Sequence, residues 1–218
     1  MTPKNRKMKT WLLLICLTVI SPALILMQQA NATTNTPDIS AFQPIIKDLQ
    51  QRFPKSPQNP LIVISASEQR LFLIKDNKVV ASHIISTAEA GLGNRKGSNK
   101  TPLGVHRVSQ KYGKEAKSGT IFKARQNTHR IAKILTQTGA RSNADNVTSR
   151  ILWLSGMESG INKGGKVDSH ARYIYIHGTD EEGRLGKPAS HGCIRMKNQA
   201  VIDLFKKVPV GTLVNIIE

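Results

Sequence analysis

Residues 61–85 read LIVISASEQRLFLIKDNKVVASHII, and this stretch decides the fold class. Two apolar runs, 61–64 and 70–74, precede Asp76-Asn77, a two-residue turn into a third run over 79–85. Short β-branched and aliphatic runs joined by such turns predict strands of a hairpin. The region is therefore predicted to begin with β-sheet.

The rest of the chain repeats this pattern with few interruptions. Several of the later runs are alternating or continuously apolar, as expected for a sandwich or barrel with a buried inner face. We predict a mainly β fold, a sandwich or barrel of mixed sheets with two or three short helices. Further strands are expected at 105–108, 150–154, 173–176 and 212–217, and helices near 41–53, 122–137 and 198–207.

Residues 1–32 have the order of a secretory signal peptide. Four basic residues and no acid lie between positions 4 and 9, and a mostly apolar run over 11–27 is followed by Ala30-Asn31-Ala32. Such a leader would direct export to the periplasm or cell wall and be cleaved after Ala32. An uncleaved membrane anchor is the alternative, because this run is near the lower limit for a span.

The remaining chain divides into a tether and one larger domain. Residues 33–60 are polar, with an amphipathic helical pattern near 41–53. Residues 61–218 are predicted to form this larger domain. Within it, the basic segment 111–149 is either a surface insertion or a lid over the site.

The chain is strongly basic. It has 32 Lys and Arg against 14 Asp and Glu, a net charge of +18, which falls to about +14 when the four leader cations are removed. An exported protein does not meet nucleic acid, so this charge predicts attraction to an acidic wall or surface. A solvated basic surface without a partner is the alternative.

Cys193 is the only cysteine outside the leader. A single cysteine cannot close an internal disulfide, so either it is a buried inert thiol or it has a chemical role. A thiol becomes an effective nucleophile when an imidazole takes its proton. His177 ends an apolar β run, where a rigid strand could hold its ring, and Gly178 would let backbone or substrate pass close by.

The neighbours of Cys193 add further candidates. The amides of Gly192 and Cys193 are candidates for an oxyanion hole, and Arg195 could hold a substrate carboxylate with two hydrogen bonds. His191 lies two residues before the thiol.

A zinc site is the strongest alternative for this cluster. It would use His177, His191 and Cys193, with His170 or Asp168 as a fourth ligand. No Cys-x-x-Cys pair or His-Glu-x-x-His helix supports it, so no metal and no cofactor is predicted.

His177-Gly-Thr followed by Ser190-His-Gly-Cys-Ile-Arg-Met resembles the signature of the L,D-transpeptidase (YkuD) catalytic domain. The Thr-Pro-Leu-Gly run at 101–104 and the Gly-Thr-Leu-Val run at 211–214 resemble other parts of this family. The resemblance covers about 60–218. The chain departs from the generic pattern at Arg195, where the family usually has Asn and a subset has Arg.

The resemblance implies chemistry on peptidoglycan stem peptides and inhibition by carbapenems. Cys193 would attack the third-residue carbonyl of a tetrapeptide, release D-Ala and pass the acyl group to an amine, giving a 3→3 cross-link or protein attachment. His177 would be the proton donor and acceptor, oriented by the Gly178 carbonyl. Ser190, His191 and Gly192 would line the site.

Two other functions stay open. A hydrolase on the same scaffold, such as an L,D-carboxypeptidase, would pass the acyl group to water. A non-catalytic wall-binding module would need neither Cys193 nor His177, so the presence of both favours an enzyme. No nucleic acid partner is predicted, and membrane contact is expected only through an uncleaved leader.

Overall fold

The computed structural model describes residues 38–218. The predicted signal peptide, 1–32, and the first residues of the predicted tether, 33–37, lie outside the described residues. No helix within 38–218 is both long and apolar enough to cross a membrane.

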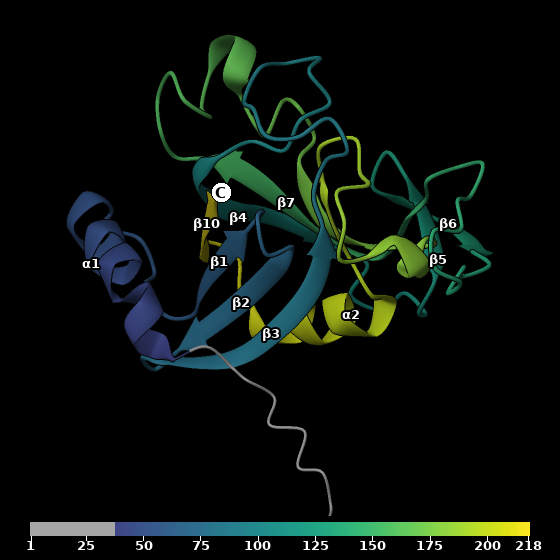
Figure 1. The fold of residues 1–218 in the computed structure, drawn as a ribbon, viewed down its shortest axis with the longest axis horizontal. Coiled ribbons are helices and arrows are strands. Elements are labelled where there is room, and N and C mark those ends of the chain that lie inside the picture. Colours follow the sequence, from purple (N-terminus) through teal and green to yellow (C-terminus); the bar gives the residue numbers. More distant parts are fainter. Residues whose placement is uncertain (1–37) are drawn as a thin grey trace, which may run out of the picture. The chain divides into compact units, whose positions relative to one another are not determined.

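The described chain is dominated by strands, with few short helices (Figure 1). The helical segments are η1 (Ile39–Phe42), α1 (Gln43–Arg52), η2 (Gly165–Val167), η3 (Glu182–Arg184) and α2 (Asn198–Lys207). The strands are β1 (Leu61–Ser65), β2 (Arg70–Lys75), β3 (Lys78–Ser86), β4 (Gly104–Tyr112), β5 (Thr120–Lys123), β6 (Gln126–Ile131), β7 (Val147–Gly156), β8 (Tyr175–Thr179), β9 (Ile194–Met196) and β10 (Leu213–Ile217).

All ten strands within 38–218 belong to one sheet that closes on itself. Their order is β4-β10-β1-β2-β3-β9-β8-β7-β5-β6, and an additional β4–β7 pairing joins the two ends of the first eight. The β1–β10 and β8–β9 pairs are parallel and the other pairs are antiparallel. The predicted mixed, barrel-like β architecture is therefore confirmed.

The apolar residues of β1 are buried on both faces of the sheet, which explains its continuous apolar run. Ile62 and Ile64 lie in the main core with residues of α2. Leu61 and Val63 face the other way, where Leu49 of α1 packs against them. Figure 1 shows α1 beside β1 and α2 beneath the sheet. The helix predicted near 41–53 is confirmed as η1 and α1.

The helix predicted near 122–137 is wrong, because this segment contains the β5–β6 hairpin. β5 pairs with β7, and Ile121 and Phe122 are buried there. Ile131, an apolar residue that a helix would have placed in the core, is 54% exposed. Pairing with a buried strand outweighed a weak local periodicity. The predicted insertion at 111–149 thus contributes to the sheet.

The helix predicted at 198–207 is confirmed as α2, with the same bounds. Lys197 is the N-cap residue, and Asn198 is the first residue of the helix. The Asn198 amide group donates to the Thr179 carbonyl (2.8 Å) and to Glu182 (2.7 Å). Glu182 also accepts from the Asn198 backbone amide (2.8 Å), so a glutamate from η3 caps the helix.

Candidate active site

The register of β8 and β9 brings the two predicted catalytic residues to one face of the sheet. Ile176 pairs with Ile194 in parallel, and both lie in the main core. Because side chains alternate along a strand, His177 and the neighbour of Ile194, Cys193, lie on the opposite face. Tyr175 also lies on that face, and Cys193 packs against its cluster.

The Cys193 thiol is half-buried between two backbone groups. The Tyr175 amide donates to Sγ (3.4 Å), and the thiol donates to the Tyr173 carbonyl (3.3 Å). Burial raises the pKa of Cys193 to about 11, against the lowering effects of the Tyr175 amide and the nearby Arg195 and Arg172. The resting form of Cys193 at neutral pH is therefore the thiol.

His177 is buried and neutral. Its Nδ1 lies 2.7 Å from the Gly178 carbonyl, which is the predicted contact. A carbonyl can only accept, so Nδ1 carries the proton and Nε2 is the basic nitrogen. Burial lowers the pKa of His177 to about 4, more than the Gly178 contact raises it. An uncharged imidazole of this kind can accept a proton from a thiol.

Gly178 is needed for space as well as for its carbonyl. A Cβ at this position would lie 2.7 Å from the Asn198 amide oxygen and 2.8 Å from the Thr148 carbonyl. The same Asn198 oxygen accepts from the Thr148 hydroxyl (2.7 Å). This hydrogen bond joins β7 to α2, and the bond from the Asn198 amide group to the Thr179 carbonyl joins α2 to β8, next to His177 in sequence.

The turn before Cys193 is held by side-chain hydroxyls. Ser190 donates to the Cys193 carbonyl (2.6 Å) and accepts from the Gly192 amide (3.1 Å). Thr101, from the predicted Thr-Pro turn, donates to the Gly192 carbonyl (3.0 Å). Gly192 has φ +130°, a conformation that favours glycine. The structure thus uses the Ser190 hydroxyl and the Gly192 amide within the turn, and it leaves the Cys193 amide as the oxyanion candidate.

Arg195 is placed differently from the expectation that it binds a substrate carboxylate. Its side chain is 2% exposed, and its two terminal nitrogens contact Asp145 (2.5 Å) and Glu181 (2.8 Å). A guanidinium engaged by two protein carboxylates cannot also clamp a substrate, so the structure gives Arg195 an internal role.

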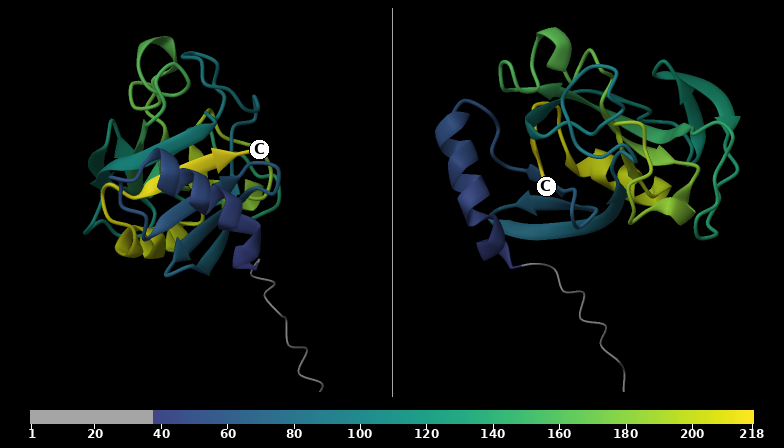
Figure 2. Two further views of the ribbon diagram at one scale, coloured as in Figure 1. Left: turned by 90° about the vertical axis from the view of Figure 1, so that its left-hand side faces the viewer. Right: turned by 45° about the horizontal axis from the view of Figure 1, so that its top comes forward.

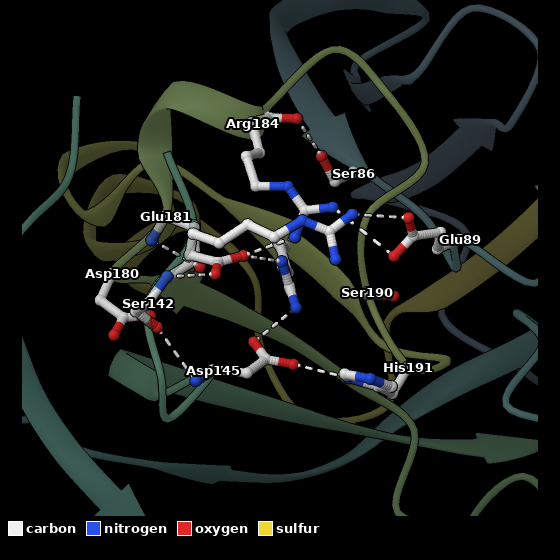
Figure 3. Close-up of polar contacts among 12 residues, drawn as sticks. Ser86, Glu89, Ser142, Asp145, Asp180, Glu181, Arg184, Ser190 and His191 are labelled. Carbon is white, nitrogen blue, oxygen red and sulfur yellow. Dashed lines mark hydrogen bonds and ion pairs between the residues drawn. The ribbon is translucent and has the colours of Figure 1, made fainter. Parts of the chain in front are cut away.

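Arg195 belongs to a chain of alternating charges, most of which Figure 3 labels. Glu181 also accepts from Arg184 (2.9 Å), and Asp145 also contacts His191 Nδ1 (2.7 Å). The carboxylate of Asp145 therefore connects two of the predicted site residues. Arg184 approaches Glu89 (3.6 Å), which pairs with Arg141 at the surface (2.8 Å).

Asp145 lies in the segment 133–146, which crosses over η3. The Leu135 amide donates to the Asp180 carbonyl (2.7 Å), and the Ser142 amide donates to Glu181 (2.7 Å). This part of the predicted insertion is thus attached to the strand end that carries His177. The pKa of Asp145 is held below its usual value, because Arg195 and His191 outweigh the opposing effect of burial.

The zinc alternative finds no support in the described residues, where no three His, Cys, Asp or Glu side chains are grouped to hold a metal. His170 stacks on Trp153 with ring centroids 3.9 Å apart. Asp168 accepts from the Gly164 and Ala171 amides.

Two loops border the thiol on one side. The 87–103 and 157–172 loops rise together in both views of Figure 2, and Arg172 donates to the Gly93 (3.2 Å) and Lys100 (2.5 Å) carbonyls across them. Between these loops lies a cavity of about 200 Å³, lined by Lys96, Asn99, Arg172, Tyr173 and His191 among others. This cavity has a basic rim, and it shares Tyr173 with the contacts of the thiol.

Sequence reasoning missed several residues around the thiol. Asp145 and Arg172 lie in segments with no recognisable motif, and their role depends on contacts distant in sequence. Tyr173 was placed in a strand, but it has φ +58° and precedes β8, with its side chain 54% exposed. A local pattern could not show this conformation.

The described residues thus form a domain with one closed, mixed β-sheet, and the half-buried thiol of Cys193 lies at its candidate site. Residues 59–216 match the model of the L,D-transpeptidase catalytic domain, YkuD. This match covers more than half of the chain, so the chain belongs to the L,D-transpeptidase (YkuD) family.

Known proteins with this domain are similar to the chain over different lengths. "Putative L,D-transpeptidase YqjB" of Bacillus subtilis (strain 168) is 29% identical over 158 residues, 72% of this chain and 71% of that protein. "Probable L,D-transpeptidase YbiS" of Escherichia coli (strain K12) is 47% identical over 47 residues, 22% of this chain and 15% of that protein.

Among solved structures, an L,D-transpeptidase from Mycobacterium smegmatis is 15% identical with a TM-score of 0.43, covering 73% of this chain and 59% of that one. LdtMt1 in complex with imipenem is 17% identical with a TM-score of 0.43, covering 72% and 58%.

Proposed function

We infer that this protein is a peptidoglycan L,D-transpeptidase with Cys193 as its nucleophile. The thiol would attack the carbonyl of the third residue of a tetrapeptide stem and release D-Ala. The acyl group would then pass to an amine, either of a second stem or of a protein. The observation that carries this proposal is the half-exposed Cys193 on the same sheet face as the neutral His177.

The ionisation of the two residues favours a particular order of proton transfer. With the pKa of Cys193 near 11 and that of His177 near 4, a resting thiolate–imidazolium pair is disfavoured. His177 Nε2 would therefore take the proton as the S–C bond forms. Breaking of the C–N bond would return this proton to the amine of D-Ala.

The second half of the reaction reverses these steps. The acceptor amine attacks the thioester carbonyl and gives a proton to His177 Nε2, and the departing sulfur takes this proton back. Each cycle thus replaces one amide bond by another and restores the thiol. The oxyanion formed in both halves would be held by the Cys193 amide.

The expected partners follow from this chemistry. The substrates would be peptidoglycan stem peptides, and carbapenems would acylate the same thiol. Stem peptides are outside the cytoplasm, so the proposal includes export of the protein to the periplasm or cell wall through the leader at 1–32. The basic surface would favour contact with an acidic wall.

Purified protein incubated with tetrapeptide-containing muropeptides tests the proposal by mass analysis of the products. Dimers are expected if the acceptor is a second stem, whereas tripeptides alone would identify a carboxypeptidase. A carbapenem should add one drug mass to wild type and none to Cys193→Ala. His177→Gln should lose activity, and His129→Gln, at an exposed histidine, should keep it. If wild type and Cys193→Ala take up the drug equally, the nucleophile is wrongly assigned.

A further inference from the structure

The β5–β6 hairpin carries Arg125 to the group of aromatic residues beside the thiol. Its guanidinium carbon lies 4.6 Å from the ring centroid of Trp153 and 5.3 Å from that of Tyr173. One of its nitrogens donates to the Tyr175 hydroxyl (3.1 Å). Arg125 thus contacts three aromatic side chains from two different parts of the chain.

Two of these aromatic residues also hold the sulfur of Cys193. The Tyr175 amide donates to Sγ, and the Tyr173 carbonyl accepts from the thiol. Cys193 also packs against the apolar cluster that contains Trp153 and Tyr175. The position of Arg125 is therefore fixed relative to the nucleophile by shared neighbours.

The turn that presents Arg125 is conformationally unfavourable. Lys123 pairs with Gln126, so Ala124 and Arg125 form a two-residue turn, with φ +46° and φ +69°. Turns with both φ values positive normally use Asn and Gly, because a Cβ is disfavoured there. The other two-residue turn of this kind, between β2 and β3, has the better suited Asp76 and Asn77. Such strain is typical of functional sites.

The guanidinium of Arg125 keeps unused donors. It is half-buried and makes one side-chain hydrogen bond within residues 38–218, to the neutral Tyr175 hydroxyl. By contrast, Arg195 is buried and already held by two carboxylates. An arginine stacked on aromatic rings with free N–H groups is well suited to bind a carboxylate.

We propose that Arg125 binds a carboxylate of the stem peptide next to Cys193, the role first expected of Arg195. This inference rests on the proposed function, because the stem supplies the carboxylate. The stem has two candidates, the terminal carboxylate of D-Ala and the carboxylate on the side chain of the third, diamino acid residue. The D-Ala carboxylate is within a few bonds of the carbonyl that the thiol would attack, and the other carboxylate lies at the end of the third residue's side chain.

Tetrapeptide variants distinguish these two sources. The wild type, Arg125→Gln and the control Arg130→Gln are compared on the natural stem, on a stem with an amidated D-Ala, and on a stem with lysine as third residue. Arg130 is an exposed arginine of the same hairpin. Arg125→Gln should lose about 10- to 100-fold in kcat/KM on the natural stem, as expected for a charge-assisted hydrogen bond. The loss should vanish on the stem that lacks the bound carboxylate.

Alkylation of Cys193 by iodoacetate and by iodoacetamide tests the site without any stem peptide. If Arg125 forms an anion site next to the thiol, its positive charge favours the anionic reagent, so Arg125→Gln should lower the iodoacetate-to-iodoacetamide rate ratio about three- to tenfold. Arg130→Gln should leave this ratio unchanged.

The two experiments separate failure of the inference from failure of the proposed function. If Arg125→Gln lowers the iodoacetate-to-iodoacetamide rate ratio but the wild type is inactive on every stem, the anion site is supported and the proposed substrate is refuted. The inference is overturned if wild type turns over the stems normally while Arg125→Gln loses the same activity on all three stems, or loses none. The proposed function then stands. Arg125→Lys should recover part of the activity, since it restores the charge without the bidentate geometry.

Discussion

Replacing Asp145 by asparagine should destabilise the protein although no core residue is changed. Asp145 neutralises one side of Arg195, whose side chain is 2% exposed, and Glu181 neutralises the other. Asparagine has nearly the shape of aspartate but no charge, so the variant removes one ionic partner of a buried guanidinium. Wild type has three arginines and three carboxylates in this chain of charges, and the variant has one uncompensated positive charge.

The size of the effect follows from the burial of the groups involved. Removing the partner of a buried ion costs about 3–5 kcal/mol, because the remaining charge is left without compensation. Here Arg195 keeps Glu181, and Asp145 is itself 30% exposed, so we expect about 2–3 kcal/mol. For a domain of this size, 1 kcal/mol shifts Tm by about 2–4 °C, so Tm should fall by roughly 5–10 °C.

Two further variants allow the expected losses of stability to be ranked. Glu181→Gln removes a partner of both Arg195 and Arg184, so it should cost more than Asp145→Asn. Glu89 is 53% exposed, and its pair with Arg141 is at the surface, so Glu89→Gln should cost less than about 1 kcal/mol. Urea unfolding followed by circular dichroism gives the three free energies. If Asp145→Asn is no less stable than Glu89→Gln, the charge chain does not stabilise the fold.

Two predictions concern pH. Because burial raises the pKa of Cys193 to about 11 and lowers that of His177 to about 4, the rate of Cys193 alkylation by iodoacetamide should rise about tenfold per pH unit between pH 6 and 10. A plateau near neutral pH would instead indicate a thiolate–imidazolium pair. Burial also lowers the pKa of His106 to about 4, so between pH 6.5 and 4 the unfolded chain binds a proton that the folded protein does not. As the pH falls from 6.5 to 4, the free energy of unfolding should therefore decrease by up to about 3 kcal/mol because of this residue. Urea unfolding measures this decrease, and His106→Gln should reduce it; an equal decrease in wild type and variant would contradict the prediction.

Much of the fold was predictable because the strands carry their own signal. The continuous apolar run at 61–64 indicates a strand that is buried on both faces, and in the structure this strand lies between two apolar clusters. The turn at Asp76-Asn77 was predicted from residue type, and both residues have positive φ. These features depend on neighbours in sequence, so a local pattern contains them.

The β5–β6 hairpin was missed because its stability comes from elsewhere. β5 pairs with β7, and the turn residues Ala124 and Arg125 give no turn signal. β9 was missed because it has only three residues, 194–196, and forms by pairing with β3 and β8. Elements fixed by contacts distant in sequence leave little trace in local composition.

The candidate site divides in the same way. That Cys193 and His177 lie on one face of the sheet could be predicted, because each belongs to a short motif at the end of an apolar run. The contacts of Arg195 could not be predicted, because a charged side chain two residues from Cys193 can face either a substrate or the protein interior. The alternation along β9 places Arg195 on the same face as Cys193. Asp145 and Glu181, which are distant in sequence, pair with Arg195 there and give it an internal role.

The same comparison indicates where a substrate carboxylate would be bound. An arginine that is already neutralised by the protein adds nothing to the recognition of an anion, whereas one held only by aromatic rings and a neutral hydroxyl can bind one. By this criterion Arg195 maintains the site and Arg125 is available to a ligand. The proposal also accounts for the strained turn at Ala124-Arg125, because a relaxed Asn-Gly turn would be more stable and would lack the guanidinium beside Trp153 and Tyr175.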